Sequence, residues 1–124
     1  MPSRVYTCDA AETNALTKLM SYDPYLDKSL SEEKIAEIKK DPEANIIFAR
    51  QDYNIKDGVS IGLDRNKSYL YLSASDEFLE QADKKLKNTI KSIERADKET
   101  EEKVIKLVEG ERSSSEEGLG SIFG

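Results

Sequence analysis

Residues 69–73 read Tyr69-Leu70-Tyr71-Leu72-Ser73, an alternation in which every second side chain is aliphatic. Successive side chains of a strand point to opposite faces, so this period of two predicts a strand with leucines on one face and tyrosines on the other. An exposed pair of tyrosines could stack nucleobases or contact a partner. We expect Tyr69 and Tyr71 instead to be core residues, covered by the N-terminal helices.

Two runs upstream extend the pattern. Val59, Ile61 and Leu63 alternate with small residues, and an apolar run lies within Asn45–Gln51. Turn signals separate the runs, at Lys56-Asp57-Gly58 and at Asp64-Arg65-Asn66-Lys67. Residues 45–73 therefore predict three antiparallel strands joined by short turns.

Before this region the pattern is that of a strand followed by a helix. Arg4–Cys8 predicts a strand, and Asp9 with Glu12 three positions later has the spacing of a capping box. The helix that follows should end near Tyr22, because Pro24 disfavours helical geometry at the preceding residue. Its predicted inner face comprises Ala15, Leu16, Leu19 and Met20.

A second, short helix is predicted to begin at Ser29 or Ser31 and to end before Pro42. Its apolar residues Ile35, Ala36 and Ile38 are expected to face inward. A helix this short depends on packing against the rest of the domain for its stability.

After the strands, Ser75 is placed to cap a helical stretch. Apolar residues then recur at steps of three and four, which predicts a cover for the leucine face: Leu79, Ala82, Leu86, Ile90 and Ile93. Helical character resumes from Asp97 to Gly110, and the pattern leaves open whether 76–110 is one helix or two. A single helix would be about 50 Å long, too long to pack on a small sheet throughout, so we expect either a break near Ala96-Asp97 or an end that projects beyond the sheet.

Together these elements predict one α+β domain over residues 1–110. It has a three- to four-stranded, mainly antiparallel β-meander covered by N-terminal helices and a long C-terminal helical segment. Residues 111–124 contain a serine spacer, acids and glycines, and are expected to form a flexible acidic tail.

Composition excludes several functional classes. The 124 residues carry a net charge of −6, contain no histidine, and contain one cysteine, Cys8. This argues against His-based triads, most zinc sites and internal disulfides, and we expect no metal, cofactor or catalytic residue. No apolar run is long enough to span a membrane. An unpaired Cys8, expected to be a buried apolar residue, suits the cytoplasm, and the interleaved charges are common in thermophilic and archaeal proteins.

The C-terminus carries the most specific motif: Glu116-Glu117-Gly118-Leu119-Gly120-Ser121-Ile122-Phe123-Gly124. It resembles the ending of archaeal ribosomal stalk proteins, which is a mobile tether whose apolar residues dock into grooves on translation factors. The resemblance implies that Leu119, Ile122 and Phe123 are the anchors and that Glu116 and Glu117 favour a basic rim. The spacing i, i+3, i+4 is also what a short helix presents to a groove. The alternative is a solubilising tail.

Five basic residues fall on neighbouring positions of the long helical stretch and could form a stripe for RNA phosphates: Lys84, Lys87, Lys91, Arg95 and Lys98. Acids stand four positions before several of them, and the same spacing continues beyond the stripe: Glu80–Lys84, Asp83–Lys87, Glu94–Lys98, Glu99–Lys103 and Glu102–Lys106. That arrangement is typical of a solvated helix that pairs its own charges.

We therefore expect a non-catalytic interaction or adaptor protein that docks onto translation factors through its tail. Two alternatives stay open. One is a regulatory domain that binds a small ligand between sheet and helices, with its response in Val59–Ser73. The other is weak RNA binding through the lysines.

Overall fold

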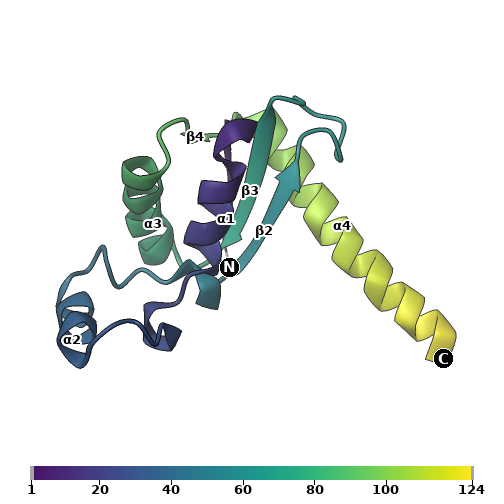
Figure 1. The fold of residues 1–124 in the computed structure, drawn as a ribbon. Helices are drawn as coiled ribbons and strands as arrows, with labels where there is room; N and C mark the ends of the chain where they lie inside the picture. The colour runs from purple at the N-terminus through teal and green to yellow at the C-terminus, as the bar shows by residue number, and fades with distance from the viewer. Residues whose placement is uncertain (1, 124) are drawn as a thin grey trace.

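The structure is a computed structural model that describes the backbone of residues 2–123 and the side chains of residues 2–111. It has an α+β fold, as predicted, with helices on both sides of one sheet (Figure 1). The strands are β1 (Ser3–Asp9), β2 (Asp52–Asp57), β3 (Lys67–Ser73) and β4 (Glu94–Arg95). The helices are α1 (Thr13–Ser21), α2 (Glu32–Lys40), α3 (Asp76–Thr89) and α4 (Lys98–Phe123), with 3-10 turns η1 (Ala10–Glu12), η2 (Pro24–Leu26) and η3 (Phe48–Arg50).

The four strands form an antiparallel sheet in the order β2-β3-β1-β4. The N-terminal strand β1 is therefore central, and it pairs with β3 from Ser3↔Ser73 to Asp9↔Lys67. On its other side β1 pairs with only the two residues of β4. Strand β2 forms the opposite edge.

The leucine face of β3 is covered by α1 and α3. Leu70 and Leu72 are completely buried there with Tyr6 of β1. The predicted stripe of the third helix completes this core, with Leu79, Ala82, Leu86, Ile90 and Ile93 at most 5% exposed. Leu16 and Met20 of α1 join the same cluster.

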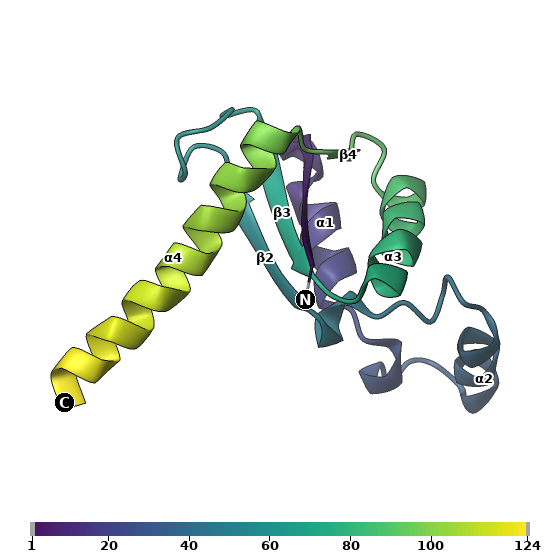
Figure 2. The same ribbon diagram turned by 180° about the vertical axis from the view of Figure 1, so that it is seen from behind.

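The tyrosine face is covered by α4. Tyr69 and Tyr71 are 5% and 3% exposed and lie in one cluster with Val104 and Val108. Their assignment to the core is confirmed, but the expectation that the N-terminal helices cover them is wrong. Figures 1 and 2 show α1 on one side of the sheet and α4 on the other. Alternation in a strand defines two faces, but it does not say which helix covers which face.

The strand predicted over Asn45–Gln51 is wrong. Phe48–Arg50 is the turn η3, although Ile46, Ile47 and Phe48 are all buried. A short run in which every residue is apolar has no period, so it does not distinguish a strand from another buried segment. Both neighbours of β3 are already supplied, by β2 and β1.

The strand predicted over Val59–Leu63 is also wrong, because these residues belong to the loop between β2 and β3. Val59 is 65% exposed and Ile61 is half-buried. The loop closes on Gly58, whose N–H donates to the carbonyl of Lys67 at 3.0 Å and whose carbonyl accepts from Leu63 at 2.9 Å. A Cβ at position 58 would lie 1.8 Å from the carbonyl oxygen of Asp64, so only glycine permits this closure.

The predicted capping box at Asp9 and Glu12 does not form. The Asp9 side chain makes no capping hydrogen bond, and η1 separates it from α1. The Glu12 carboxylate instead accepts hydrogen bonds from the N–H groups of Lys91 and Ser92, at 3.1 and 2.9 Å. Glu12 therefore joins the start of α1 to the segment that follows α3. The pKa of Glu12 is lowered, first by a hydrogen bond with the side chain of Ser92 and then by these main-chain bonds.

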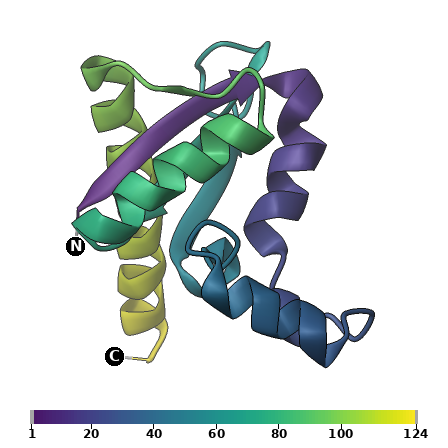
Figure 3. The same cartoon turned by 90° about the vertical axis from the view of Figure 1, so that its left-hand side faces the viewer.

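Helix α2 begins after Ser31, whose hydroxyl accepts from the N–H of Lys34 at 3.2 Å, as predicted. Its predicted inward face does not form, because none of its residues is buried; Ile35 and Ile38 are half-buried and Ala36 is exposed. Figure 3 shows α2 at the edge of the molecule, away from the sheet. Helix α2 therefore lacks the packing against the sheet on which a helix this short was expected to depend.

The predicted break near Ala96 is confirmed, and the region divides into two helices. Ser75 caps α3 by accepting from the N–H of Phe78 at 3.3 Å. The chain leaves α3 after Thr89, adds β4 to the sheet, and begins α4 at Lys98. This crossing carries the chain from the leucine face to the tyrosine face.

Candidate functional site

The first turn of α4 is fixed to β1 by main-chain and side-chain bonds. Asp97 caps the helix by accepting from the N–H of Thr100 at 2.7 Å, a bond that lowers the pKa of Asp97. The N–H of Ala96 donates to the carbonyl of Val5 at 2.9 Å. One oxygen of Glu101 accepts both from the N–H of Val5 and from the guanidinium of Arg95. The position of α4 is therefore set by the central strand.

The contact of α4 with the sheet is short. Val104 and Val108 are 0% and 1% exposed, and Leu107, on the outer side, is 37% exposed. An ion pair of 2.6 Å joins Lys56 of β2 to Glu111 of α4. Beyond it α4 extends away from the sheet to its end (Figure 2).

The predicted anchors belong to this extension. The backbone of α4 is helical to Phe123. The side chains of the predicted docking residues lie outside the described residues: Glu116, Glu117, Leu119, Ile122 and Phe123. The predicted flexible tail at 111–124 and its docking role therefore stay predictions.

The five basic residues do not share one helix. Lys84 and Lys87 lie on α3, whereas the other three lie in the linker, in β4 and at the start of α4: Lys91, Arg95 and Lys98. Of the predicted pairs, Asp83–Lys87 and Glu99–Lys103 form, at 2.9 and 3.5 Å. The other three do not form ion pairs among the described side chains: Glu80–Lys84, Glu94–Lys98 and Glu102–Lys106. Arg95 is held by both oxygens of Glu101. A single phosphate-binding stripe along one helix is thus contradicted, since the helix is broken.

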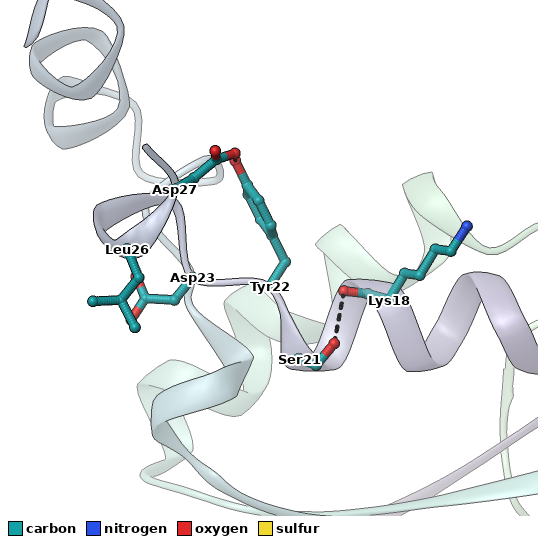
Figure 4. A pocket seen from close by; sticks show the side chains of 6 residues that line it. All are labelled: Lys18, Ser21, Tyr22, Asp23, Leu26 and Asp27. Carbon is teal, nitrogen blue, oxygen red and sulfur yellow. Dashed lines mark hydrogen bonds between the residues drawn. The ribbon is translucent and has the colours of Figure 1, made fainter. Parts of the chain in front are cut away.

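An open depression of about 540 Å³ lies at the end of α1, shown in Figure 4. Tyr22 and Leu26 line it and are 47% and 77% exposed. The Tyr22 hydroxyl donates to Asp27 at 2.7 Å, a bond that raises the pKa of Tyr22. Figure 4 shows these side chains, and because Tyr22 and Leu26 are exposed the hollow is an open surface and not an enclosed site.

A polar cavity of about 300 Å³ lies where β1, β3 and β4 meet the start of α4. It is lined by Thr7, Lys67 and Tyr69, with the charged groups of the β4–α4 junction. The Thr7 hydroxyl is buried and, among the described side chains, lacks a hydrogen-bond partner. Part of this lining belongs to the segment in which the ligand-binding alternative predicted a response.

A third cavity, of about 200 Å³, adjoins Lys85 of α3. Sequence reasoning did not select Lys85, although a signal was present. Its neighbours Lys84 and Lys87 have an acid four positions earlier, whereas Lys85 has Gln81. A lysine without such an acid, next to the buried positions Ala82 and Leu86, is placed to contact another element.

Cys8 is 2% exposed, as expected of a small apolar residue. Burial, with the charges of Glu12 and Asp9, raises the pKa of its thiol to about 11. The thiol is therefore protonated at neutral pH and is a poor nucleophile. Within residues 2–111, no group of three or more Cys, Asp or Glu side chains is placed to hold a metal ion.

Comparison of the chain with known protein families, with curated proteins and with solved structures finds no match. In the part of the chain that the structure describes, no helix has the length and apolar character needed to cross a membrane.

Proposed function

We propose that this protein is a non-catalytic adaptor whose folded domain carries a C-terminal peptide for docking onto translation factors. The observation that carries the proposal is the sequence at 116–124, with its stalk-like order of acids, glycines and apolar residues. The position of α4 supports it. Val104 and Val108 are buried against the sheet, and the backbone of α4 then extends away from it.

The chemistry of docking follows from the spacing of the anchors. Leu119, Ile122 and Phe123 lie at i, i+3 and i+4, so a helical turn presents all three to one apolar groove. Glu116 and Glu117 precede them and complement a basic rim. If the peptide orders on binding, the entropy cost keeps the affinity modest, which suits repeated capture and release.

In this proposal the folded domain fixes the position of α4, the helix that leads to the docking peptide. Bonds from Ala96 and Glu101 to Val5 fix the start of α4 to the central strand. Both faces of the sheet are covered by the protein's own helices. The proposal therefore assigns partner binding to the C-terminal end of α4.

The test is binding of the full chain to archaeal-type translational GTPases, measured by isothermal titration calorimetry. Deletion of residues 113–124 is expected to abolish binding. Combined substitution L119A, I122A and F123A is expected to weaken it by more than about tenfold, because few apolar anchors carry most of the energy of such contacts. The matched control is S113A, S114A and S115A in the same tail, with an unchanged Kd. Equal binding by the full chain and the deletion variant would overturn the proposal.

A further inference from the structure

The cavity beside Lys85 is built from four separate segments. Leu19, Tyr22 and Pro24 come from α1 and the chain that directly follows it, and Ile38 comes from α2. Ala44 and Ile46 come from the connection before η3, and Lys85 comes from α3. All of its lining side chains except Lys85 and the tyrosine hydroxyl are apolar. The volume of about 200 Å³ is that of about seven water molecules in the liquid.

Lys85 places a cation at the wall of this apolar space. Its Nζ donates to the carbonyl of Ile46 at 2.8 Å and lies 5.8 Å from the ring centre of Phe48. An ammonium has three donors, and one is used by this bond. Within the described residues, no carboxylate lies within the 4.0 Å of an ion pair with Lys85.

The two acids whose charges act on Lys85 accept hydrogen bonds from other groups. Glu43 accepts from the side-chain amide of Asn88 at 2.8 Å, and Asp41 accepts from the N–H of Glu43 at 3.0 Å. Burial lowers the pKa of Lys85, while the charges of Glu43 and Asp41 act in the opposite direction. Burying a cation halfway without a carboxylate partner costs free energy. An anion that forms a charge-assisted hydrogen bond with Nζ is therefore bound more strongly than it would be by an exposed lysine.

One wall of the cavity can move without disturbing the core. Ile38 is the only lining residue from α2, and none of the residues of α2 is buried. The segments before and after α2 are joined by a hydrogen bond of 2.6 Å from the Tyr25 hydroxyl to the side chain of Asn45. Displacement of α2 therefore opens the cavity at little cost in buried apolar area.

We propose that this cavity binds a small apolar monocarboxylate, with the carboxylate on Nζ of Lys85 and the hydrocarbon between Leu19, Ile38 and Ile46. A mostly apolar hollow with one fixed charge is the usual form of a small-molecule site. The volume limits the ligand to about the size of hexanoate, given the space a water molecule occupies. This site is separate from the tail and does not depend on the proposed docking function.

The test is a ¹⁵N NMR titration of the full chain with sodium hexanoate, beside hexanamide as the neutral molecule of the same shape. We expect saturable shifts at the amides of Leu19, Ile38 and Ile46, with a Kd on the order of 1 mM for so few atoms. Hexanamide should bind about tenfold more weakly, because it lacks the charge-assisted bond.

Two variants complete the test. K85M should weaken hexanoate binding by about tenfold, and K84M, its exposed neighbour, should leave the Kd unchanged. If K85M does not fold, the comparison of hexanoate with hexanamide on the unmodified chain decides alone. Absence of saturation at 20 times the expected Kd, on the order of 20 mM, equal binding of hexanamide, or unchanged binding by folded K85M would overturn the proposal.

Discussion

The carboxylate of Glu101 accepts a hydrogen bond from the N–H of Val5 at 3.0 Å, so a side chain of α4 occupies a position where a neighbouring strand would pair. Strand β4 pairs with β1 only opposite Tyr6 and Thr7. Glu101 extends that edge by one residue and is itself held by Arg95. The bond connects the central strand to the helix that carries the C-terminus.

We predict that E101A lowers the free energy of unfolding by about 2 kcal/mol, because a part-buried N–H loses its acceptor and Arg95 loses its partner. E102A is the matched control: Glu102 is exposed on the next position of α4, and its removal should change stability by less than about 0.5 kcal/mol. Urea denaturation of the two variants measures the difference. Equal stability of E101A and E102A would contradict the role of this bond.

The same residue predicts a pH dependence. Burial alone raises the pKa of Glu101, but hydrogen bonds from Arg95 and Val5 outweigh it and the pKa is lowered. A carboxyl whose folded-state pKa is lowered contributes stability above its unfolded-state pKa of about 4.3, and that contribution is lost as pH falls through the folded-state value.

The stability advantage of the unmodified chain over E101Q should therefore be complete above about pH 5.5 and should shrink towards pH 3. Denaturation curves across this range test it, since other titrating groups are common to both proteins. An advantage that stays constant down to pH 3 would argue against a lowered pKa.

The thiol of Cys8 should be unreactive in the folded protein. With a pKa of about 11, only about one thiol in a thousand is ionised at pH 8. Reaction with Ellman's reagent is expected to be more than about a hundredfold slower in buffer than in guanidinium, where the thiol is exposed. Equal rates in the two solutions would contradict the burial of Cys8.

Gly58 should tolerate no side chain. The Cβ of G58A would meet the carbonyl oxygen of Asp64 at 1.8 Å, and the predicted loss of stability is about 2–3 kcal/mol. G110A is the control, because a Cβ there meets nothing within 4 Å and alanine favours helix. It should stabilise the protein by about 0.5–1 kcal/mol. A G58A protein as stable as the unmodified chain would contradict the loop closure.

The sequence predicts those elements whose burial has a clear period. Leu70 and Leu72 alternate with Tyr69 and Tyr71, and the structure buries the two pairs on opposite faces. The stripe from Leu79 to Ile93 is confirmed for the same reason. The caps at Ser31 and Ser75 are confirmed because each depends on a hydrogen bond to an N–H three residues later. In each case a local pattern and the tertiary packing agree.

The predictions fail where the local pattern is ambiguous or where distant segments decide. Val59, Ile61 and Leu63 alternate as a strand does, but the close approach of Gly58 to Asp64 turns them into a loop. Glu12 has the spacing of a capping residue, but its carboxylate accepts hydrogen bonds from the N–H groups of Lys91 and Ser92 instead. These contacts join residues about 80 positions apart.

The Lys85 cavity illustrates the same limit. The missing acid four residues before Lys85 could have marked this side chain, yet the cavity exists only because Leu19, Ile38 and Ile46 meet beside it. No spacing in the sequence brings those three together. The docking peptide at 116–124 is the opposite case, since its motif is contiguous and readable from the sequence alone.

The most direct measurement for the central proposal is ¹⁵N NMR of the full chain during titration with an archaeal-type translational GTPase. We expect the amides of residues 116–123 to shift or broaden, while those of Val5, Leu70 and Val104 stay unchanged. Perturbation of the sheet and of α1 or α3, with the C-terminal amides unaffected, would contradict docking through the tail.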